Sequence, residues 1–130
     1  MNEASVWKSF KHQAQRQGML ACRVETSTMR GMPDVIYSYR SHRGFIELKY
    51  LENWPVRVGL SIKLGLSKLQ ESFLKRHGTV GNYCWVIIRI SDELFLIPWY
   101  HLDKELTVQT IYEYSKWHGK RFSAAMFAYL

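Results

Sequence analysis

The sequence predicts an α/β domain in which a mostly central β-sheet carries helices on its faces. Segments with apolar residues at helical spacing alternate with short runs of β-branched and aromatic residues, in the order α-β-β-β-α-β-β-α. The run YCWVIIRI, Tyr83 to Ile90, is the most hydrophobic and predicts a central strand. At 130 residues the chain is long enough for one core but too short for two, so we expect a single domain over residues 1–130.

The first half of the chain predicts one helix and three strands. The helix covers residues 4–17 and ends at Gly18, and its apolar positions are Val6, Phe10 and Ala14. The strands are predicted over residues 19–26, 35–39 and 45–50. A turn-rich connection over residues 27–33 follows the first strand, and the polar turn RSHRG, Arg40 to Gly44, joins the other two.

The second half begins with an irregular segment over residues 51–66. The next helix has Ser67 as its N-cap and Gly78 just beyond its end. Two strands follow, over residues 83–90 and 94–99. The domain core would then span residues 3–100. Residues 101–130 would form a helical extension, in which LTVQTIYEYSKW is a helix and RFSAAMFAYL is another helix or a docked apolar tail.

The net charge of +7 and the pI near 9.5 favour a polyanionic partner such as nucleic acid, because phosphate contacts release counterions. The same charge could simply keep a small domain soluble. No apolar run approaches the roughly 18 residues that a membrane span needs. The N-terminal residues have no apolar signal region. We therefore expect a cytoplasmic protein with no membrane partner.

Two acids and a lysine interrupt the otherwise apolar hairpin. Glu47 and Lys49 share one strand face because side chains alternate, whereas their neighbours Ile46, Leu48 and Tyr50 point the other way. If the turn spans Arg40 to Gly44, Val35 lies opposite Lys49 and Asp34 lies opposite Tyr50. The three charged groups then meet at one end of the hairpin.

This set of charged groups suits metal-assisted phosphodiester hydrolysis. Two carboxylates fit an oxygen-ligated ion such as Mg²⁺, which keeps waters for the substrate and the nucleophile. A neighbouring lysine can stabilise charge that develops on a phosphoryl oxygen. The alternative is a surface ion pair between Glu47 and Lys49. That alternative does not explain Pro33-Asp34 at the entrance of the strand, behind a glycine-containing loop.

Pro33-Asp34 followed by Glu47-Leu48-Lys49 resembles the PD-(D/E)XK nuclease superfamily, whose core has the order αβββαβ. The stretches RGMPDVIYSYRSHRGFIELKY and LSKLQESFLKRHG are similar to small phage and bacterial nucleases of the VRR-NUC type and to archaeal-type Holliday junction resolvases. The resemblance covers residues 3–90. It implies a restriction-endonuclease-like α/β fold.

The resemblance also implies roles for individual residues. Asp34, Glu47 and the Leu48 carbonyl would ligate Mg²⁺ or Mn²⁺, and Lys49 would be the catalytic lysine. Glu3, in the first helix, would reach the metal through water, or it could simply favour the helix N-terminus electrostatically. Glu25 is a weaker stand-in for Glu3.

Gln70 has two interpretations. Ser67 and Gln70 have the spacing of a capping box. In the resembling nucleases, a glutamine in this helix instead faces the active site, and we favour that role. Trp54 could stack on a base, although tryptophan more often packs in a core. The basic residues expected to contact DNA are Arg30, Arg57, Lys63 and Lys68.

The resemblance thus implies a metal-dependent DNA endonuclease that hydrolyses phosphodiesters with metal-activated water, with a possible preference for branched or flapped DNA. Relatives of this kind pair to cut two strands, so we expect a homodimer. The terminal AAMFAYL would suit its interface, and it would equally suit docking within the same chain. No small-molecule cofactor is expected, and the cell would be bacterial or phage-infected. The alternative is a non-catalytic nucleic-acid-binding module that retains the nuclease fold.

Overall fold

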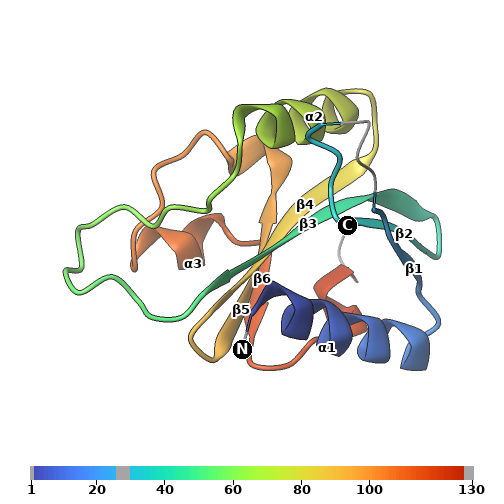
Figure 1. Cartoon of the computed structure of the whole chain (residues 1–130), viewed down its shortest axis with the longest axis horizontal. Helices are drawn as coiled ribbons and strands as arrows, with labels where there is room; N and C mark the ends of the chain where they lie inside the picture. The colour runs from blue at the N-terminus through green and yellow to red at the C-terminus, as the bar shows by residue number, and fades with distance from the viewer. Residues whose placement is uncertain (1, 26–29, 128–130) are drawn as a thin grey trace.

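The computed structural model describes residues 2–25 and 30–127 (Figure 1). Part of the predicted connection before Pro33, the end of the first predicted strand and the last three residues of the predicted tail lie outside this range. Within the described residues, no helix is long and apolar enough to cross a membrane.

One six-stranded sheet, with its strands in sequence order, forms the centre of the fold. All neighbouring strands are antiparallel except β3 and β4, which run parallel and are connected through α2. The strands are β1 (Leu20–Arg23), β2 (Val35–Tyr39), β3 (His42–Leu51), β4 (Tyr83–Ile90), β5 (Glu93–Pro98) and β6 (Trp117–Gly119). The helices are α1 (Glu3–Arg16), α2 (Lys68–Thr79) and α3 (Thr110–Tyr114), with short 3₁₀ turns η1 (Trp99–His101) and η2 (Ala124–Phe127). The predicted α/β class and the element order through β5 are confirmed.

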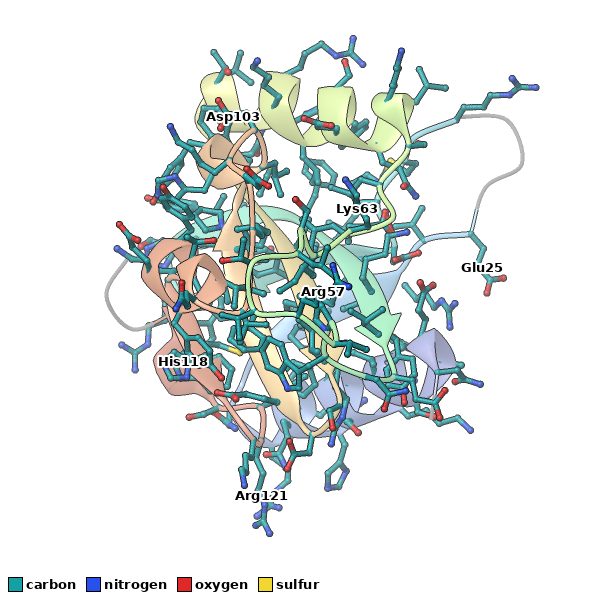
Figure 2. The ribbon with its side chains drawn as sticks, turned by 90° about the vertical axis from the view of Figure 1, so that its left-hand side faces the viewer. Glu25, Arg57, Lys63, Asp103, His118 and Arg121 are labelled. Carbon is teal, nitrogen blue, oxygen red and sulfur yellow. The ribbon has the colours of Figure 1, made fainter. Side chains whose placement is uncertain are left out.

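Helices cover both faces of the sheet, as Figure 1 shows. On one face, Phe10 of α1 packs with Ile46 and Leu48 of β3. On the other, Leu74 of α2 packs with Val86 and other buried residues of β4. Residues 52–66 cross in front of the sheet in the view of Figure 2. β4 lies in the middle of the sheet, as its hydrophobic sequence predicts.

The hairpin between β2 and β3 has a different register from the predicted one. Its turn contains only Arg40 and Ser41, because Tyr39 pairs directly with His42. The positive φ of 55° at Arg40 closes this tight connection. Val35 consequently pairs with Ile46, three residues earlier in β3 than expected, and the predicted pairings with Lys49 and Tyr50 are wrong.

Gly44 explains why the turn is short. It was expected in the turn, but it lies within β3 opposite Tyr83, where a Cβ atom would overlap the Tyr83 carbonyl. Gly44 is therefore a strand residue that pairs with β4, and it is not available for the turn.

The end of α2 also differs from the prediction. Ser67 is the N-cap as expected, but the helix continues through Gly78 and reaches Thr79. A Cβ atom on Gly78 would overlap the ring of Trp99. This glycine therefore allows close packing of α2 on η1 and does not end the helix.

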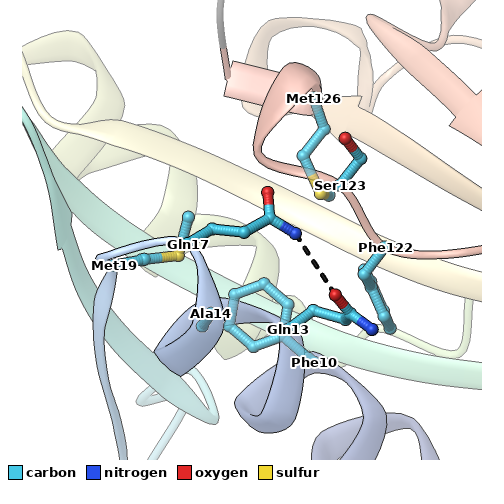
Figure 3. A pocket seen from close by; sticks show the side chains of 8 residues that line it. All are labelled: Phe10, Gln13, Ala14, Gln17, Met19, Phe122, Ser123 and Met126. Carbon is cyan, nitrogen blue, oxygen red and sulfur yellow. Dashed lines mark hydrogen bonds between the residues drawn. The ribbon is translucent and has the colours of Figure 1, made fainter.

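The C-terminal segment docks on the α1 face of the sheet. Figure 3 shows Phe122 and Met126 lying over Phe10 and Ala14 of α1. These residues line a cavity of about 10 Å³. Phe122 meets Phe10 edge to face, with ring centroids 5.3 Å apart. Of the two predictions for this stretch, a docked apolar tail fits the described residues better than a helix.

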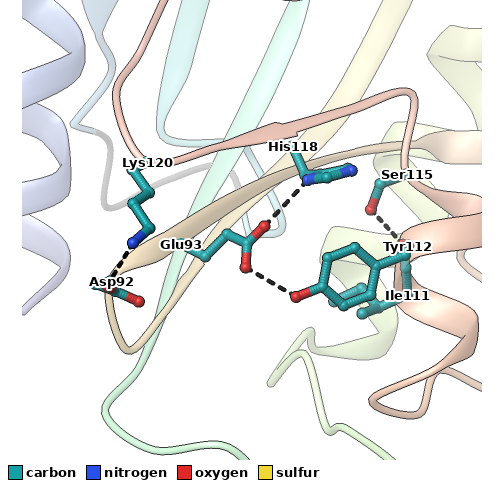
Figure 4. A network of polar contacts seen from close by, with 7 residues as sticks. All are labelled: Asp92, Glu93, Ile111, Tyr112, Ser115, His118 and Lys120. Atoms are coloured by element: carbon teal, nitrogen blue, oxygen red, sulfur yellow. Dashed lines mark hydrogen bonds and ion pairs between the residues drawn. The ribbon is translucent and has the colours of Figure 1, made fainter.

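The predicted helix over LTVQTIYEYSKW is largely wrong. Only α3 is helical there, and the chain then forms β6, which pairs with the edge of β5. Figure 4 shows the contacts that hold this arrangement: Tyr112 donates a 2.8 Å hydrogen bond to Glu93, and His118 Nδ1 lies 3.0 Å from the same carboxylate. Burial, together with Glu93, raises the pKa of Tyr112 to about 12, so the phenol keeps its donated proton.

Gly44→Ala tests the β3–β4 contact. We expect the free energy of unfolding to fall by about 2–3 kcal/mol, because the new methyl group must push two backbones apart. Gly59→Ala is the matched control, since a Cβ atom there meets nothing within 4 Å. Urea unfolding of both variants provides the measurement, and equal stability would contradict this account of the pairing.

Candidate active site

Asp34 and Glu47 are neighbours across the β2–β3 ladder. Val35 pairs with Ile46, so Asp34 lies one step further along, beside Glu47. Val35 and Ile46 belong to the core on the α1 face, which directs the alternating Asp34 and Glu47 to the α2 face. The corrected register thus brings the two carboxylates closer than the predicted one did.

Asp34 is fixed by the backbone of β3. The Leu48 N–H group donates a 2.9 Å hydrogen bond to Asp34 Oδ2, so the side chain continues the ladder where β2 begins. The Asp34 carbonyl accepts a 2.7 Å hydrogen bond from the Val24 N–H group on its other side. Pro33 is buried next to it, and these contacts together hold the carboxylate in place.

Glu47 is unusual because it is a buried carboxylate with an unsatisfied oxygen. Its side chain is 2% exposed, and it is the sole charged residue among the buried ones in the described part of the chain. Its Oε2 atom has no hydrogen-bond partner there. Burial first, and then the hydrogen bond and charge of Asp34, raise the pKa of Glu47 well above 4.5. An unpartnered buried oxygen beside a second carboxyl group is an environment that a cation would stabilise.

Lys49 lies two residues beyond Glu47 on the same strand and is half-buried. Its positive charge lowers the pKa of Glu47, against the effect of burial. The two ion pairs within the described residues do not include it. The Lys49 ammonium group is therefore near the carboxylates and is not committed to either of them.

Glu3 lies at the start of α1, where it is exposed. Its negative charge contributes to the raised pKa of Glu47, which places it in electrostatic range of that carboxylate. No group of three or more His, Cys, Asp and Glu side chains able to hold a metal ion occurs in residues 2–25 and 30–127. Glu3 therefore does not complete a direct three-carboxylate site, and its indirect role remains a prediction.

Glu25, the predicted stand-in for Glu3, is exposed. Figure 2 shows its side chain projecting outward at the edge of the molecule.

Gln70 forms the capping box. Its Oε1 atom accepts a 2.9 Å hydrogen bond from the Ser67 N–H group, and Ser67 Oγ accepts a 3.1 Å hydrogen bond from the Gln70 N–H group. The carbonyl end of this side chain is therefore engaged. A role in the site would have to use its amide nitrogen, which donates to no other described residue.

Gly31 positions the loop before Asp34, a role that the sequence reasoning missed. Its φ is +81°, and a Cβ atom would lie 2.6 Å from the Leu69 carbonyl oxygen. Only glycine allows the loop to contact α2 so closely, next to Gln70. The glycine two residues before Pro33 was the available signal, but its contact with α2 could not be read from the sequence.

The basic residues predicted to contact DNA are all exposed: Arg30, Arg57, Lys63 and Lys68. Figure 2 shows Arg57 and Lys63 on one side of the molecule, on the segment that follows β3. This segment is anchored by a 2.6 Å hydrogen bond from Ser61 Oγ to Glu105. Trp54 of the same segment stacks on Tyr112 and meets Phe95 edge to face, so it packs as a core residue.

The buried carboxylate predicts a pH effect on stability. Because the pKa of Glu47 in the folded protein lies above 4.5, ionising this group costs folding free energy. In EDTA, wild type should therefore lose stability relative to Glu47→Gln as pH rises above 4.5, by up to about 5 kcal/mol near pH 8.

Urea unfolding across this pH range measures the difference. Glu52→Gln, the same exchange at an exposed position, should follow wild type. A constant difference between wild type and Glu47→Gln at all pH values would show that Glu47 is not perturbed.

Comparison with known proteins gives a structural match without a sequence match. No protein-family model matches the chain, and no curated protein matches its sequence significantly. Among solved structures, the chain is similar to Archaeoglobus fulgidus Hjc, a Holliday junction resolvase from an archaeal hyperthermophile. The TM-score is 0.63 at 15% identity, over 86% of this chain and 93% of the resolvase chain.

At 15% identity, the comparison shows a common fold and does not show a common function. The matched part includes most of both chains, so the likeness concerns the whole domain and not one motif. The chain therefore has the restriction-endonuclease-like α/β fold that its sequence predicts, the fold of this resolvase.

Proposed function

We propose that this protein is a divalent-metal-dependent DNA endonuclease of the PD-(D/E)XK type. The observation that carries the proposal is the buried Glu47, which has an unpartnered oxygen, next to the half-buried Asp34 and the uncommitted Lys49. The proposal is also supported by the fold, which is similar to that of a Holliday junction resolvase.

The residues present fit a hard divalent cation. Two adjacent carboxylates supply charged oxygens, and Glu47 Oε2 has no other partner among the described residues. Mg²⁺ commonly takes one or two protein carboxylates and keeps its remaining positions for water and phosphate. Asp34, Glu47 and the Leu48 carbonyl would hold Mg²⁺ or Mn²⁺, and Glu3 would contribute through water.

Each of these groups would have its own role in the hydrolytic step. A bound cation would neutralise phosphate oxygens and lower the pKa of a coordinated water. Lys49 would donate a hydrogen bond to the attacking water or to a phosphate oxygen, and its charge would stabilise the negative charge that develops there. Asp34, fixed by the Leu48 N–H group, would keep its second oxygen directed at the site. The Gln70 amide would orient the phosphate or the water.

A non-catalytic nucleic-acid-binding module is the second candidate, favoured by the net charge of +7. Such a module gains nothing from two adjacent carboxylates, because they repel a phosphate backbone. Burying Glu47 without a partner also lowers stability. These two costs favour the enzyme.

Branched or flapped DNA is the proposed substrate, by analogy with the resolvase and with the VRR-NUC-type nucleases that the sequence resembles. Duplex arms would contact Arg30, Arg57, Lys63 and Lys68, which are exposed and free to reach phosphates. We further propose a cytoplasmic homodimer that cuts two strands. A solution mass near 15.4 kDa would contradict the dimer.

Metal binding predicts a change in thermal stability that does not depend on activity. Saturating Mg²⁺ should raise the Tm of wild type by about 5 °C, because a ligand that binds only the folded state stabilises it. Asp34→Asn and Glu47→Gln should lose most of this rise, whereas Glu52→Gln should keep it. A rise of equal size in all four proteins would place the metal elsewhere.

Removing Lys49 should slow cleavage strongly while the fold is kept. Lys49→Ala should lower the rate of Mg²⁺-dependent nicking of supercoiled plasmid by about 10²–10³-fold, because a positioned charge in the transition state is lost. Lys75→Ala, at an exposed position of α2, is the control. Junction binding without nicking by wild type, in Mg²⁺ and in Mn²⁺, would favour the binding module.

A further inference from the structure

We propose that a second cavity, at the start of β4, binds the base of an unpaired nucleotide in the DNA substrate. This inference rests on the proposed function for the identity of the partner, and it adds a recognition site outside the carboxylate cluster. The cavity has a volume of about 160 Å³. Its lining residues are Tyr83, Cys84, Trp85, Pro98, Trp99, Tyr100 and Lys116.

The lining has the chemistry that recognises a nucleobase. Three aromatic side chains that remain partly accessible, those of Tyr83, Trp99 and Tyr100, supply ring surfaces for stacking. Tyr83 is 37% exposed and Tyr100 is 49% exposed, although both carry large apolar rings. Lys116 is the one charged residue of the lining, and it forms neither of the ion pairs found among the described residues. A planar ring with an attached phosphate matches this combination.

A buried hydrogen-bond network holds two of the lining residues, Tyr83 and Trp85, in place. The Tyr37 hydroxyl donates a 3.2 Å hydrogen bond to the Tyr83 carbonyl and accepts a 2.7 Å hydrogen bond from Trp85 Nε1. Burial raises the pKa of Tyr37, so the hydroxyl remains a donor at neutral pH. Trp99, another lining residue, packs against Gly78 of α2. A preformed cavity binds a base with little loss of side-chain freedom.

A basic hollow adjoins the cavity. Tyr83 lines both, and the second hollow also includes Arg40, Arg43 and Asn82. Arg40 and Arg43 are exposed, and neither takes part in an ion pair with another described residue. The arginines can contact the phosphates on either side of a nucleotide whose base enters the cavity.

The cavity lies at a useful distance from the carboxylates. Tyr83 pairs with Gly44, whereas Val86 pairs with Glu47 in the same parallel ladder. Three strand residues correspond to roughly 10 Å along the strands, and the one or two strand spacings between β3 and the lining of the cavity add about 5–10 Å across the sheet. The separation is therefore about 11–14 Å, or roughly three to four nucleotides of duplex rise. A strand cut at Glu47 could therefore place an unpaired base in the cavity, so the site would select DNA with a single-stranded portion close to the cleaved bond.

Binding in EDTA, where cleavage is prevented, tests the cavity separately from the catalytic proposal. The probes are a fluorescent blunt duplex and the same duplex with a single-stranded overhang, followed by anisotropy. Wild type should prefer the overhang. Tyr100→Ala and Lys116→Ala should weaken overhang binding by about tenfold and leave duplex binding nearly unchanged. Tyr100→Phe keeps the ring, and Lys104→Ala removes an exposed lysine outside the cavity; both should bind as wild type does.

Equal losses on the two probes, or no loss on either, would overturn the proposal. Thermal unfolding of each variant identifies a misfolded protein, and Lys116→Ala keeps the test valid if Tyr100→Ala is unstable, because Lys116 is exposed. The plasmid assay separates the two proposals. Nicking by Tyr100→Ala together with an absent overhang preference in wild type would reject only the cavity. Overhang preference without any nicking by wild type would reject only the nuclease.

Discussion

The burial of Glu47 beside Asp34 is the constraint on which the rest of the site depends. A carboxylate that is 2% exposed and has an unsatisfied oxygen lowers the stability of the fold, and the second carboxyl group adds to this cost. The fold tolerates the cost because β3 is paired on both sides and packed on both faces. A strand at the sheet edge could not hold these groups in a fixed position, because water and chain motion would let them separate.

The parallel pairing of β3 with β4 makes this position possible. Gly44 lets the two strands meet at their beginning, and the ladder then continues from Tyr83 to Ile90. The crossover through α2 brings Gln70 and Leu69 next to the loop that carries Gly31. The parallel pairing of β3 with β4 requires the crossover through α2, and this crossover places α2 against the loop that leads to Asp34.

The sequence predicted the fold class and the identity of the charged cluster because both follow from local patterns. Alternation places Glu47 and Lys49 on one face whatever the register, and YCWVIIRI can be accommodated only in the interior of a sheet. The register was wrong because Gly44 has two uses, as a turn residue and as a contact in a parallel pair, and sequence spacing does not separate them. Gly78 was misread for the same reason, since its partner Trp99 lies far along the chain. The predicted C-terminal helix is shortened to α3 because β5 offers an edge, and the chain leaves the helix after Tyr114 to pair with that edge from Trp117 onward.

Under the proposed function, DNA binding near Asp34 and Glu47 depends on whether a proton or a cation neutralises these two carboxylates. The chain carries a net charge of +7, and under the proposed function this charge would attract a phosphate backbone at long range. At short range the two carboxylates of Asp34 and Glu47 repel the same phosphate unless a proton or a cation neutralises them. The raised pKa of Glu47 shows that its surroundings already disfavour the doubly ionised pair. Under the proposed function, the metal therefore has two roles: it completes the chemistry, and it removes the repulsion that would keep the scissile phosphate away from Lys49. Under the same proposal, the surface would attract DNA while the metal-free site repels it, so the protein would hold DNA without cutting it until the cation arrives, and binding and cleavage would be separable steps.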